Sequence, residues 1–198
     1  MTLILASQSA SRRAMLTAAG VPFTAEAAGV DEESVKAALQ ADGADGRALA
    51  DALAEMKAVK LSRRYPDALV LGSDSTVQAA DGSLIDKAGS REDSARQLRA
   101  LSGTTHRLTS AAVVAQGGVP IWRHVDVARM TMRRLSDGFI DSYLDAEWPV
   151  IAGCVGGYRI EGPGVQLFER IEGSHFTILG LPLLPLLAWL RDRGVIGA

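Results

Sequence analysis

The sequence is short of the residues on which several common protein classes depend. Its 198 residues include one cysteine, Cys154, and three histidines. A single cysteine cannot form an internal disulfide, and the histidines at 106, 124 and 175 do not have the spacing of zinc ligands. We therefore expect neither a disulfide-stabilised fold nor a structural zinc site, and a reducing, cytoplasmic location fits this composition.

Long apolar runs and an excess of charge of one sign are also missing. The most apolar segment, residues 178–190, is shorter than the ~20 residues of a membrane-spanning helix, and Pro182 and Pro185 interrupt it. The first residues reach polar positions at once, which is not typical of a signal peptide. The formal net charge of −2 gives no general attraction to nucleic acid or acidic lipid. We expect neither kind of partner, and any basic surface should be local.

The apolar fraction that is present is sufficient for a core. Hydrophobic residues make up 47% of the chain and charged residues 22%. No internal repeat or long linker divides the sequence, so we predict a single domain over residues 1–198. The P-loop signature, the Gly-x-Ser-x-Gly elbow and the dinucleotide fingerprint are all absent, which excludes three familiar kinds of active site.

The first polar segment predicts a strand, a turn and a helix N-terminus. Residues 3–6 are a short apolar run typical of a buried strand, and Ser9 is a good N-cap for the helix that follows. Arg12 and Arg13 then fall in the first helical turn, where the helix dipole opposes cations. One interpretation is a phosphate cradle that also uses Ser7. The other is a capped helix with solvated arginines.

Two charged candidates lie further along the chain. The acidic residues 31–33 precede a helix, where they can be dipole partners or, through Glu32, metal ligands facing a phosphate. A long helix is predicted over residues 47–65, and Lys57 lies at the edge of its apolar stripe. A lysine there usually extends to water, but it can instead project into a cleft.

A second apolar strand, predicted over residues 68–71, is followed by polar residues. Catalytic groups of α/β proteins usually lie at the carboxyl ends of such strands, which makes Asp74 a candidate. Asp81-Gly82 predicts a two-residue hairpin that would place Lys87 opposite Thr76 and diagonally near Asp74. This pair is either a structural salt bridge or part of a site for phosphate chemistry.

The remaining sequence predicts further helices and strands of an α/β fold. We expect a helix capped by Ser90, strands over 105–115 and 119–133, a helix over 136–146, a glycine-rich segment over 152–164, strands over 165–171 and 176–179, and a last helix ending at Gly194.

Several short motifs, each weak alone, follow one another along the chain in a characteristic order. They are Leu5-Ala-Ser-Gln-Ser-x-x-Arg-Arg13, Val30-Asp-Glu32, Lys57-Ala58, Gly72-Ser-Asp74, Lys87, Leu101-Ser-Gly-x-x-His106, Tyr158-x-Ile-Glu-Gly162, Ile171-Glu-Gly173 and Gly180-Leu-Pro182. On these motifs, the chain resembles the Maf family of nucleoside triphosphate pyrophosphatases along nearly its whole length.

The resemblance implies a fold, a reaction and a cofactor. The fold is an elongated α/β structure whose mixed sheet is flanked by helices, with a deep substrate cleft between two lobes. The reaction is hydrolysis of a nucleoside triphosphate to the monophosphate and pyrophosphate, which removes unwanted nucleotides. A divalent cation, Mg²⁺ or Mn²⁺, is expected, together with a homodimer and an older association with septum formation.

The resemblance also assigns roles by position. Asp74 is implied as the acid/base carboxylate and Glu32 lies beside the site, so both are candidate catalytic residues and metal ligands, with Lys87 as a further catalytic candidate. Ser7, Ser9, Arg12, Arg13, Lys57 and Lys87 are implied to contact the substrate and its phosphates. Two other classes stay open: a nucleotidyl transferase, and a non-catalytic regulator of cell division that binds nucleotide.

The chain departs from the usual family pattern at several motifs. Ala10 replaces a proline, Ser73-Asp74-Ser75 replaces Ala-Asp-Thr, and Asp86-Lys87-Ala88 replaces Gly-Lys-Pro. Glu161 stands where the pyrimidine-directed branch tends to have glutamine. The chain therefore looks more like the 7-methyl-GTP branch, with dTTP or UTP as the alternative substrates. Glu161 can contact the base, or it can merely help to hold a metal or the glycine-rich segment.

Overall fold

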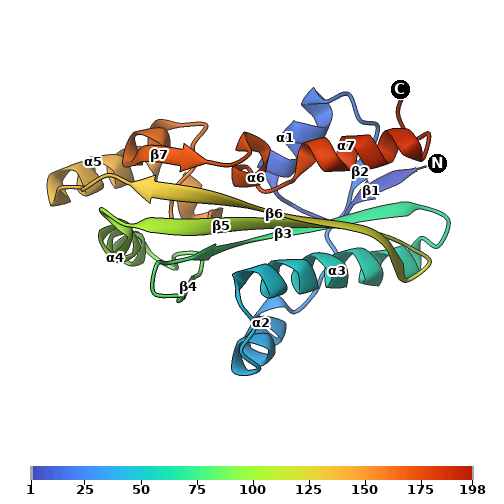
Figure 1. Ribbon diagram of the computed structural model, residues 1–198, viewed down its shortest axis with the longest axis horizontal. Coiled ribbons are helices and arrows are strands. Elements are labelled where there is room, and N and C mark those ends of the chain that lie inside the picture. Colours follow the sequence, from blue (N-terminus) through green and yellow to red (C-terminus); the bar gives the residue numbers. More distant parts are fainter. Residues whose placement is uncertain (1, 198) are drawn as a thin grey trace. The chain divides into compact units, whose positions relative to one another are not determined.

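Seven strands form one mixed sheet in the computed structural model, which describes residues 2–197 (Figure 1). Their order is β2-β1-β3-β5-β6-β7, with β4 paired to β3. Strand β1 is parallel to β2 and β3, whereas β4 and β7 are antiparallel to their neighbours. The strands are β1 (Leu3–Leu5), β2 (Thr24–Ala25), β3 (Leu69–Gln78), β4 (Leu84–Ile85), β5 (Thr105–Gln116), β6 (Val119–Met132) and β7 (Phe168–Glu172). The predicted α/β class is confirmed.

Seven α-helices accompany this sheet in the part of the chain from residue 2 to 197. They are α1 (Ala10–Ala18), α2 (Glu32–Ala41), α3 (Gly46–Arg64), α4 (Arg91–Leu101), α5 (Asp137–Glu147), α6 (His175–Ile178) and α7 (Leu183–Asp192), with 3-10 turns at Val150–Gly153 and Pro163–Leu167. None of these helices is both long and apolar enough to cross a membrane.

The chain divides into two compact units, each assembled from separate segments. The first contains the residues up to Ser75, residues 109–126 and the residues from Ser174 onward. The second contains residues 76–108 and 127–173. Strands β3, β5 and β6 begin in one unit and end in the other. The substrate cleft that the sequence resemblance implies stays a prediction.

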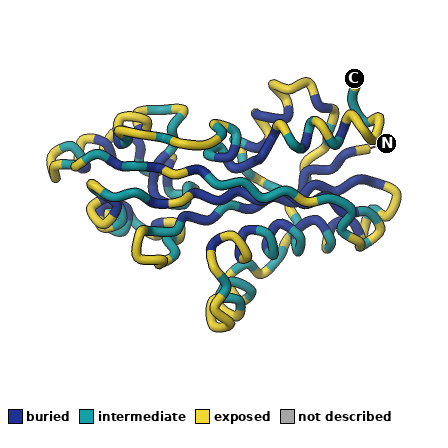
Figure 2. Tube along the Cα trace, in the orientation of Figure 1, coloured by how far each residue is buried: buried dark blue, intermediate teal, exposed yellow. Residues whose placement is uncertain are grey.

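In the first unit, apolar side chains cover both faces of the strands. One cluster joins α1 and α7 to residues such as Leu69 and Leu71 of β3. The opposite face of β5 packs against Ala50, Ala54 and Ala58 of α3. Figure 1 shows α1 and α7 on one side of β3 and α3 on the other. Figure 2 shows that β3 and β5 are buried over most of their length.

Strand β3 passes between these two layers, so its side chains alternate between them. The odd-numbered residues, which include Leu71, belong to the face covered by α1 and α7. The even-numbered residues, which include Val70, belong to the face of α3, because Val70 packs with Leu61. Ser73 and Ser75 therefore share one face of the strand, and Gly72 and Asp74 share the other.

Most predicted elements are confirmed, with boundaries within a few residues. Ser9 caps α1 by accepting a hydrogen bond from the Arg12 backbone N–H, and Ser90 and Ser136 cap α4 and α5 in the same way. The long hairpin of β5 and β6 turns at Gly117 and Gly118, both of which have positive φ. The caps and turns are local signals, which explains why they could be read from sequence.

Three predicted elements are wrong in type or extent. Residues 176–179 lie largely in the short helix α6, because a four-residue apolar run does not distinguish a strand from a helix. The strand predicted over 165–171 begins at Phe168, since Pro163 starts a 3-10 turn instead. Strand β3 does not end at Leu71 but continues to Gln78, so Asp74 lies inside the strand.

The predicted hairpin register is also wrong, by one residue. Val77 pairs with Ile85, and the Ala79 N–H donates to the Ser83 carbonyl oxygen at 2.8 Å, which leaves a three-residue loop ending at Gly82 (φ 90°). A shift of one residue exchanges the two faces of a strand. Lys87 is therefore not opposite Thr76, and its backbone pairs instead with Val155.

Gly72 lies where α3 packs directly against β3, and this generates a stability prediction. A Cβ atom at Gly72 would lie 2.1 Å from the Ala54 carbonyl oxygen and 2.7 Å from the Ala58 nitrogen, so α3 would have to move. We expect Gly72→Ala to lower the free energy of unfolding by about 3 kcal/mol or more, measured by chemical denaturation.

Gly138→Ala in α5 is the matched control. Nothing lies within 4 Å of a Cβ atom there, and we expect unchanged or slightly increased stability. Wild-type stability of Gly72→Ala would contradict the close packing of α3 on β3.

Candidate functional site

A buried ion pair joins α3 to β3 next to this close contact. Lys57 follows Ala54 by three residues on the buried face of α3, and its Nζ lies 2.5 Å from Asp74 Oδ1. Only 8% of Lys57 and 8% of Asp74 is exposed. Of the two possibilities left open for Lys57, the structure supports projection into the protein. Its place on α3 also differs from the prediction, because it lies within the buried stripe and not at its edge.

Glu32 provides the second carboxylate of this cluster. It occupies the first turn of α2, whose N-cap Asp31 accepts a hydrogen bond from the Ser34 backbone N–H. Glu32 Oε1 lies 2.9 Å from Lys57 Nζ, and about a third of its side chain is exposed. One ammonium group therefore holds two carboxylates from two different elements.

Arg12 is buried on the other face of β3. Its Nε donates to the Gly180 carbonyl oxygen at 2.7 Å, and its terminal nitrogens donate to Ser7 Oγ at 3.3 Å and to Ser75 Oγ at 3.0 Å. Burial lowers the pKa of Arg12, and the charges of Asp74 and Glu32 act in the opposite direction. Since an arginine stays protonated even so, the site contains two cations and two carboxylates.

The two serines of the first motif organise the turn before α1. Ser7 Oγ accepts hydrogen bonds from the Ser9 backbone N–H at 3.2 Å and from Arg12. Ser9 Oγ accepts the Arg12 backbone N–H as the helix cap. Arg13, in contrast, is exposed, and its side chain makes no hydrogen bond or ion pair with any residue between 2 and 197. Its assignment to a phosphate site stays a prediction.

Lys87 and Glu161 belong to the second unit. Both are exposed, and the charges of both act on the thiol of Cys154: burial and Glu161 raise the pKa of Cys154, whereas Arg159 and Lys87 lower it. Both charges therefore lie within electrostatic reach of the Cys154 thiol, a shared neighbour that the sequence did not indicate. The predicted roles of both residues stay predictions.

Two buried contacts hold the segment that carries Glu161. The Arg159 guanidinium donates to both carboxylate oxygens of the buried Glu147, at 2.5 and 3.1 Å. The neighbouring Tyr158 hydroxyl lies 2.7 Å from His106 Nε2, and burial lowers the pKa of His106 to about 4, so that its ring is neutral at pH 7. The motif residues His106 and Tyr158 therefore meet in the core of the second unit.

The carboxylates of the first unit can hold a metal only with help from other ligands. Among residues 2–197, no group of three or more His, Cys, Asp or Glu side chains is arranged to bind a metal ion. Mg²⁺ usually takes one or two carboxylates and completes its coordination with water and substrate phosphates. Asp74 and Glu32 fit that arrangement as a pair.

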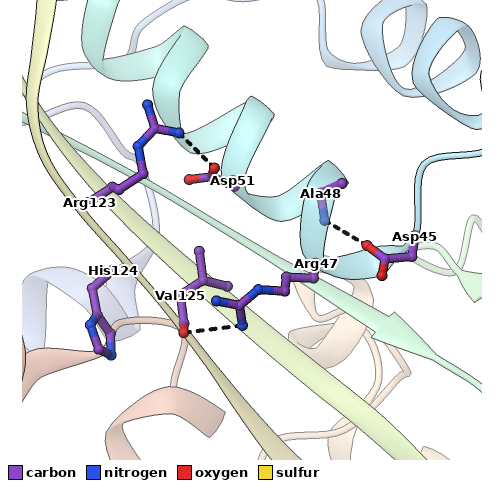
Figure 3. Close-up of a pocket in the computed structure, with 7 residues that line it drawn as sticks. All are labelled: Asp45, Arg47, Ala48, Asp51, Arg123, His124 and Val125. Carbon is purple, nitrogen blue, oxygen red and sulfur yellow. Dashed lines mark hydrogen bonds and ion pairs between the residues drawn. The ribbon is translucent and has the colours of Figure 1, made fainter.

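A separate surface hollow of about 480 Å³ lies between α3 and β6 in the first unit (Figure 3). Its arginines are already occupied: Arg123 bonds Asp51 and Glu55, and Arg47 donates to the Val125 carbonyl oxygen. None of the predicted site residues lines it. We therefore do not assign the phosphate site to this hollow.

Ser75, Ser110 and Gly180 contact Arg12 or one another, and the prediction from sequence did not assign them to the site. Ser75 Oγ lies 2.8 Å from Ser110 Oγ, and Ser110 Oγ donates to the Thr177 carbonyl oxygen at 2.7 Å. A hydroxyl residue within the apolar run of β5 was the only signal for Ser110. Nothing local connected it with Arg12.

The comparisons with known proteins agree along the whole chain. The model of the Maf-like protein family matches residues 2–193. A protein of Sphingopyxis alaskensis named nucleoside triphosphate pyrophosphatase is 53% identical, with 98% of both chains covered. One of the same name from Ruegeria pomeroyi is 50% identical, with 98% of this chain and 97% of that protein covered. A Rhizobium meliloti protein named 7-methyl-GTP pyrophosphatase is 49% identical, over 99% of this chain and 98% of its own.

Proposed function

The chain belongs to the family of Maf-like proteins, and on that premise we propose that it is a nucleoside triphosphate pyrophosphatase. It hydrolyses a nucleoside triphosphate to the monophosphate and pyrophosphate, which suits a role in cleaning the nucleotide pool. The observation that carries this proposal is the largely buried cluster in which Lys57 bonds Asp74 and Glu32, with both carboxylates within electrostatic reach of Arg12. The sequence resemblance led to the same reaction.

The reaction needs positive charge at the phosphates and a carboxylate at the attacking water. Water attacks the α-phosphorus, the bond from this phosphorus to the bridging oxygen breaks, and pyrophosphate leaves with the bonding electrons. Arg12 has hydrogen-bond donors and a fixed charge with which to stabilise the phosphate oxygens, helped by the N-terminus of α1. Asp74 orients the water and accepts its proton.

Lys57 holds the carboxylates in place for this work. Its Nζ lies within 3 Å of oxygens from both Asp74 and Glu32, which keeps two like charges on one side of the site. A divalent cation, Mg²⁺ or Mn²⁺, bound by Asp74 and Glu32 would supply charge neutralisation at the phosphates and a more acidic water. We assign Ser7, Ser9, Arg13 and Lys87 to phosphate binding from the sequence resemblance.

Two alternatives would use the same residues differently. A nucleotidyl transferase would give the nucleotidyl group to an acceptor other than water, and a regulatory protein would bind nucleotide without turnover. The buried Lys57–Asp74 pair favours an enzyme, because a buried charge pair contributes little to stability by itself. A homodimer and a cytoplasmic location, both implied by the resemblance, stay predictions.

The products test the proposed reaction. Given a panel of nucleoside triphosphates with Mg²⁺ or Mn²⁺, we expect equal amounts of pyrophosphate and free monophosphate, each measured separately from orthophosphate. Orthophosphate as the first product would mean cleavage at the γ position and would contradict the proposal. Monophosphate that appears only on an added acceptor would favour the transferase.

The charge of Asp74 is tested by Asp74→Asn, which keeps the side-chain size. We expect kcat for pyrophosphate release to fall by about 10²–10⁴-fold, because the water loses its base and a metal its ligand. Asp45→Asn is the control, since asparagine caps α3 as well as aspartate does, and its kcat should match the wild type. Near-normal turnover of Asp74→Asn would contradict the role of Asp74 and indicate that Glu32 is the carboxylate that activates the water.

Substrate choice rests on Glu161 in the second unit. Methylation at N7 gives guanine a positive charge, which an exposed carboxylate favours, and the N1–H and amino group of guanine are donors to it. We therefore propose 7-methyl-GTP over dTTP and UTP as the substrate. The 7-methyl-GTP pyrophosphatase named among the relatives supports this choice.

Glu161→Gln tests this choice through the ratio of kcat/KM for 7-methyl-GTP to kcat/KM for dTTP or UTP. We expect wild-type kcat/KM to be higher for 7-methyl-GTP than for dTTP or UTP, and the variant to reduce that ratio because the carboxylate charge is lost. Glu169→Gln removes another exposed carboxylate of the second unit and should leave the ratio unchanged. Higher kcat/KM for dTTP and UTP in the wild type would reject the base assignment but not the reaction.

A further inference from the structure

Strands β3 and β5 contribute two hydroxyl groups beside Arg12, and we propose that Ser75 and Ser110 are positioning residues that fix its guanidinium for phosphate binding. The proposal rests on the proposed function only in taking Arg12 as a ligand of the triphosphate. All of the residues involved belong to the first unit. The two serines come from neighbouring strands of the sheet and are 35 residues apart in sequence.

The direction of each hydrogen bond follows from counting protons. A carbonyl oxygen can only accept, so the single proton of the Ser110 hydroxyl goes to the Thr177 carbonyl oxygen. Ser110 must then accept from Ser75, because its own proton is used. Ser75 in turn accepts from Arg12 Nη2. The chain therefore runs one way, from Arg12 through Ser75 and Ser110 to a backbone carbonyl.

A second anchor holds the other end of the guanidinium. The Gly180 carbonyl oxygen accepts from Arg12 Nε at 2.7 Å and from Ser73 Oγ at 2.9 Å. Gly180 has φ 100°, and a Cβ atom there would lie 3.3 Å from Arg12 Nε and 3.4 Å from Ser75 Oγ. The positive φ favours glycine, and a side chain there would also press on Arg12 and Ser75.

These anchors leave specific donors for a ligand. A guanidinium has five N–H groups, and the bonds to Gly180, Ser7 and Ser75 use three of them. One N–H remains on each terminal nitrogen, with no hydrogen-bond partner among residues 2–197. Two donors on one rigid fork suit two phosphate oxygens. Without Ser75, the guanidinium loses one of its three bonds and is held less rigidly by Gly180 and Ser7 alone.

The experiment measures the affinity for inorganic tripolyphosphate by isothermal titration calorimetry. We expect Ser75→Ala and Ser110→Ala each to weaken binding about 5- to 30-fold, and Ser75→Thr, which keeps the hydroxyl, to bind within about 2-fold of the wild type. Ser62→Ala, which removes a buried hydroxyl on α3, is the control and should bind as the wild type does. Circular dichroism verifies that each variant is folded.

A double-mutant cycle separates positioning from general damage. Arg12→Lys keeps the charge but has no fork, so Ser75→Ala should cause less than about a 2-fold further loss in that background. If Ser75→Ala weakens binding equally with Arg12 and with Lys, Ser75 does not act through Arg12 and the proposal is overturned. If Arg12→Lys abolishes detectable binding, kcat/KM for the nucleotide replaces affinity in the same cycle.

The remaining outcomes distinguish a failure of the positioning role from a failure of the proposed pyrophosphatase reaction. Wild-type affinity in Ser110→Ala would overturn the chain beyond Ser75, and wild-type affinity in Arg12→Lys would overturn the role of the guanidinium fork. Wild-type protein that binds tripolyphosphate, responds to the serine variants as expected and yet releases no pyrophosphate would reject the proposed reaction and retain the positioning role.

Discussion

The close approach of α3 to β3 is the constraint on which the candidate site depends. Gly72 has no side chain, so the backbone of α3 at Ala54 and Ala58 can lie directly against the strand. Asp74 is two residues further along the same face of β3, and Lys57 lies between those alanines on α3. A wider separation would leave a buried carboxylate without its cation, which costs far more than the pair contributes when formed.

The alternation of β3 divides the site chemistry between two layers. Asp74 faces α3 and is held by Lys57, while Ser73 and Ser75 face the opposite layer and are held by Gly180 and Arg12. The sequence Ser73-Asp74-Ser75 therefore fixes a carboxylate on one face and two hydroxyls on the other. This explains how three consecutive polar residues can be accommodated in the centre of a buried strand without an unpaired group.

Elements determined by local signals could be predicted from the sequence, whereas contacts between residues far apart in the sequence could not. Serine caps and glycine turns located α1, α4, α5 and the long hairpin, because each is determined within a few residues. The predicted register of β4 against β3 was wrong because a two-residue and a three-residue loop share the same Asp-Gly signal. The bonds from Arg12 to Ser75 and from Ser110 to Thr177 span 63 and 67 residues, and no pattern in either segment predicts its partner.

The contacts that hold the candidate residues fall within one unit or the other. Lys57, Asp74 and Arg12 are held by bonds inside the first unit, and the segment of Glu161 is held inside the second by Glu147 and His106. The bonds of Lys57 and Arg12 all go to residues of the first unit, so none of them involves Glu161. Under the proposed function, base preference can therefore change at Glu161 without the loss of any bond that Lys57 or Arg12 makes.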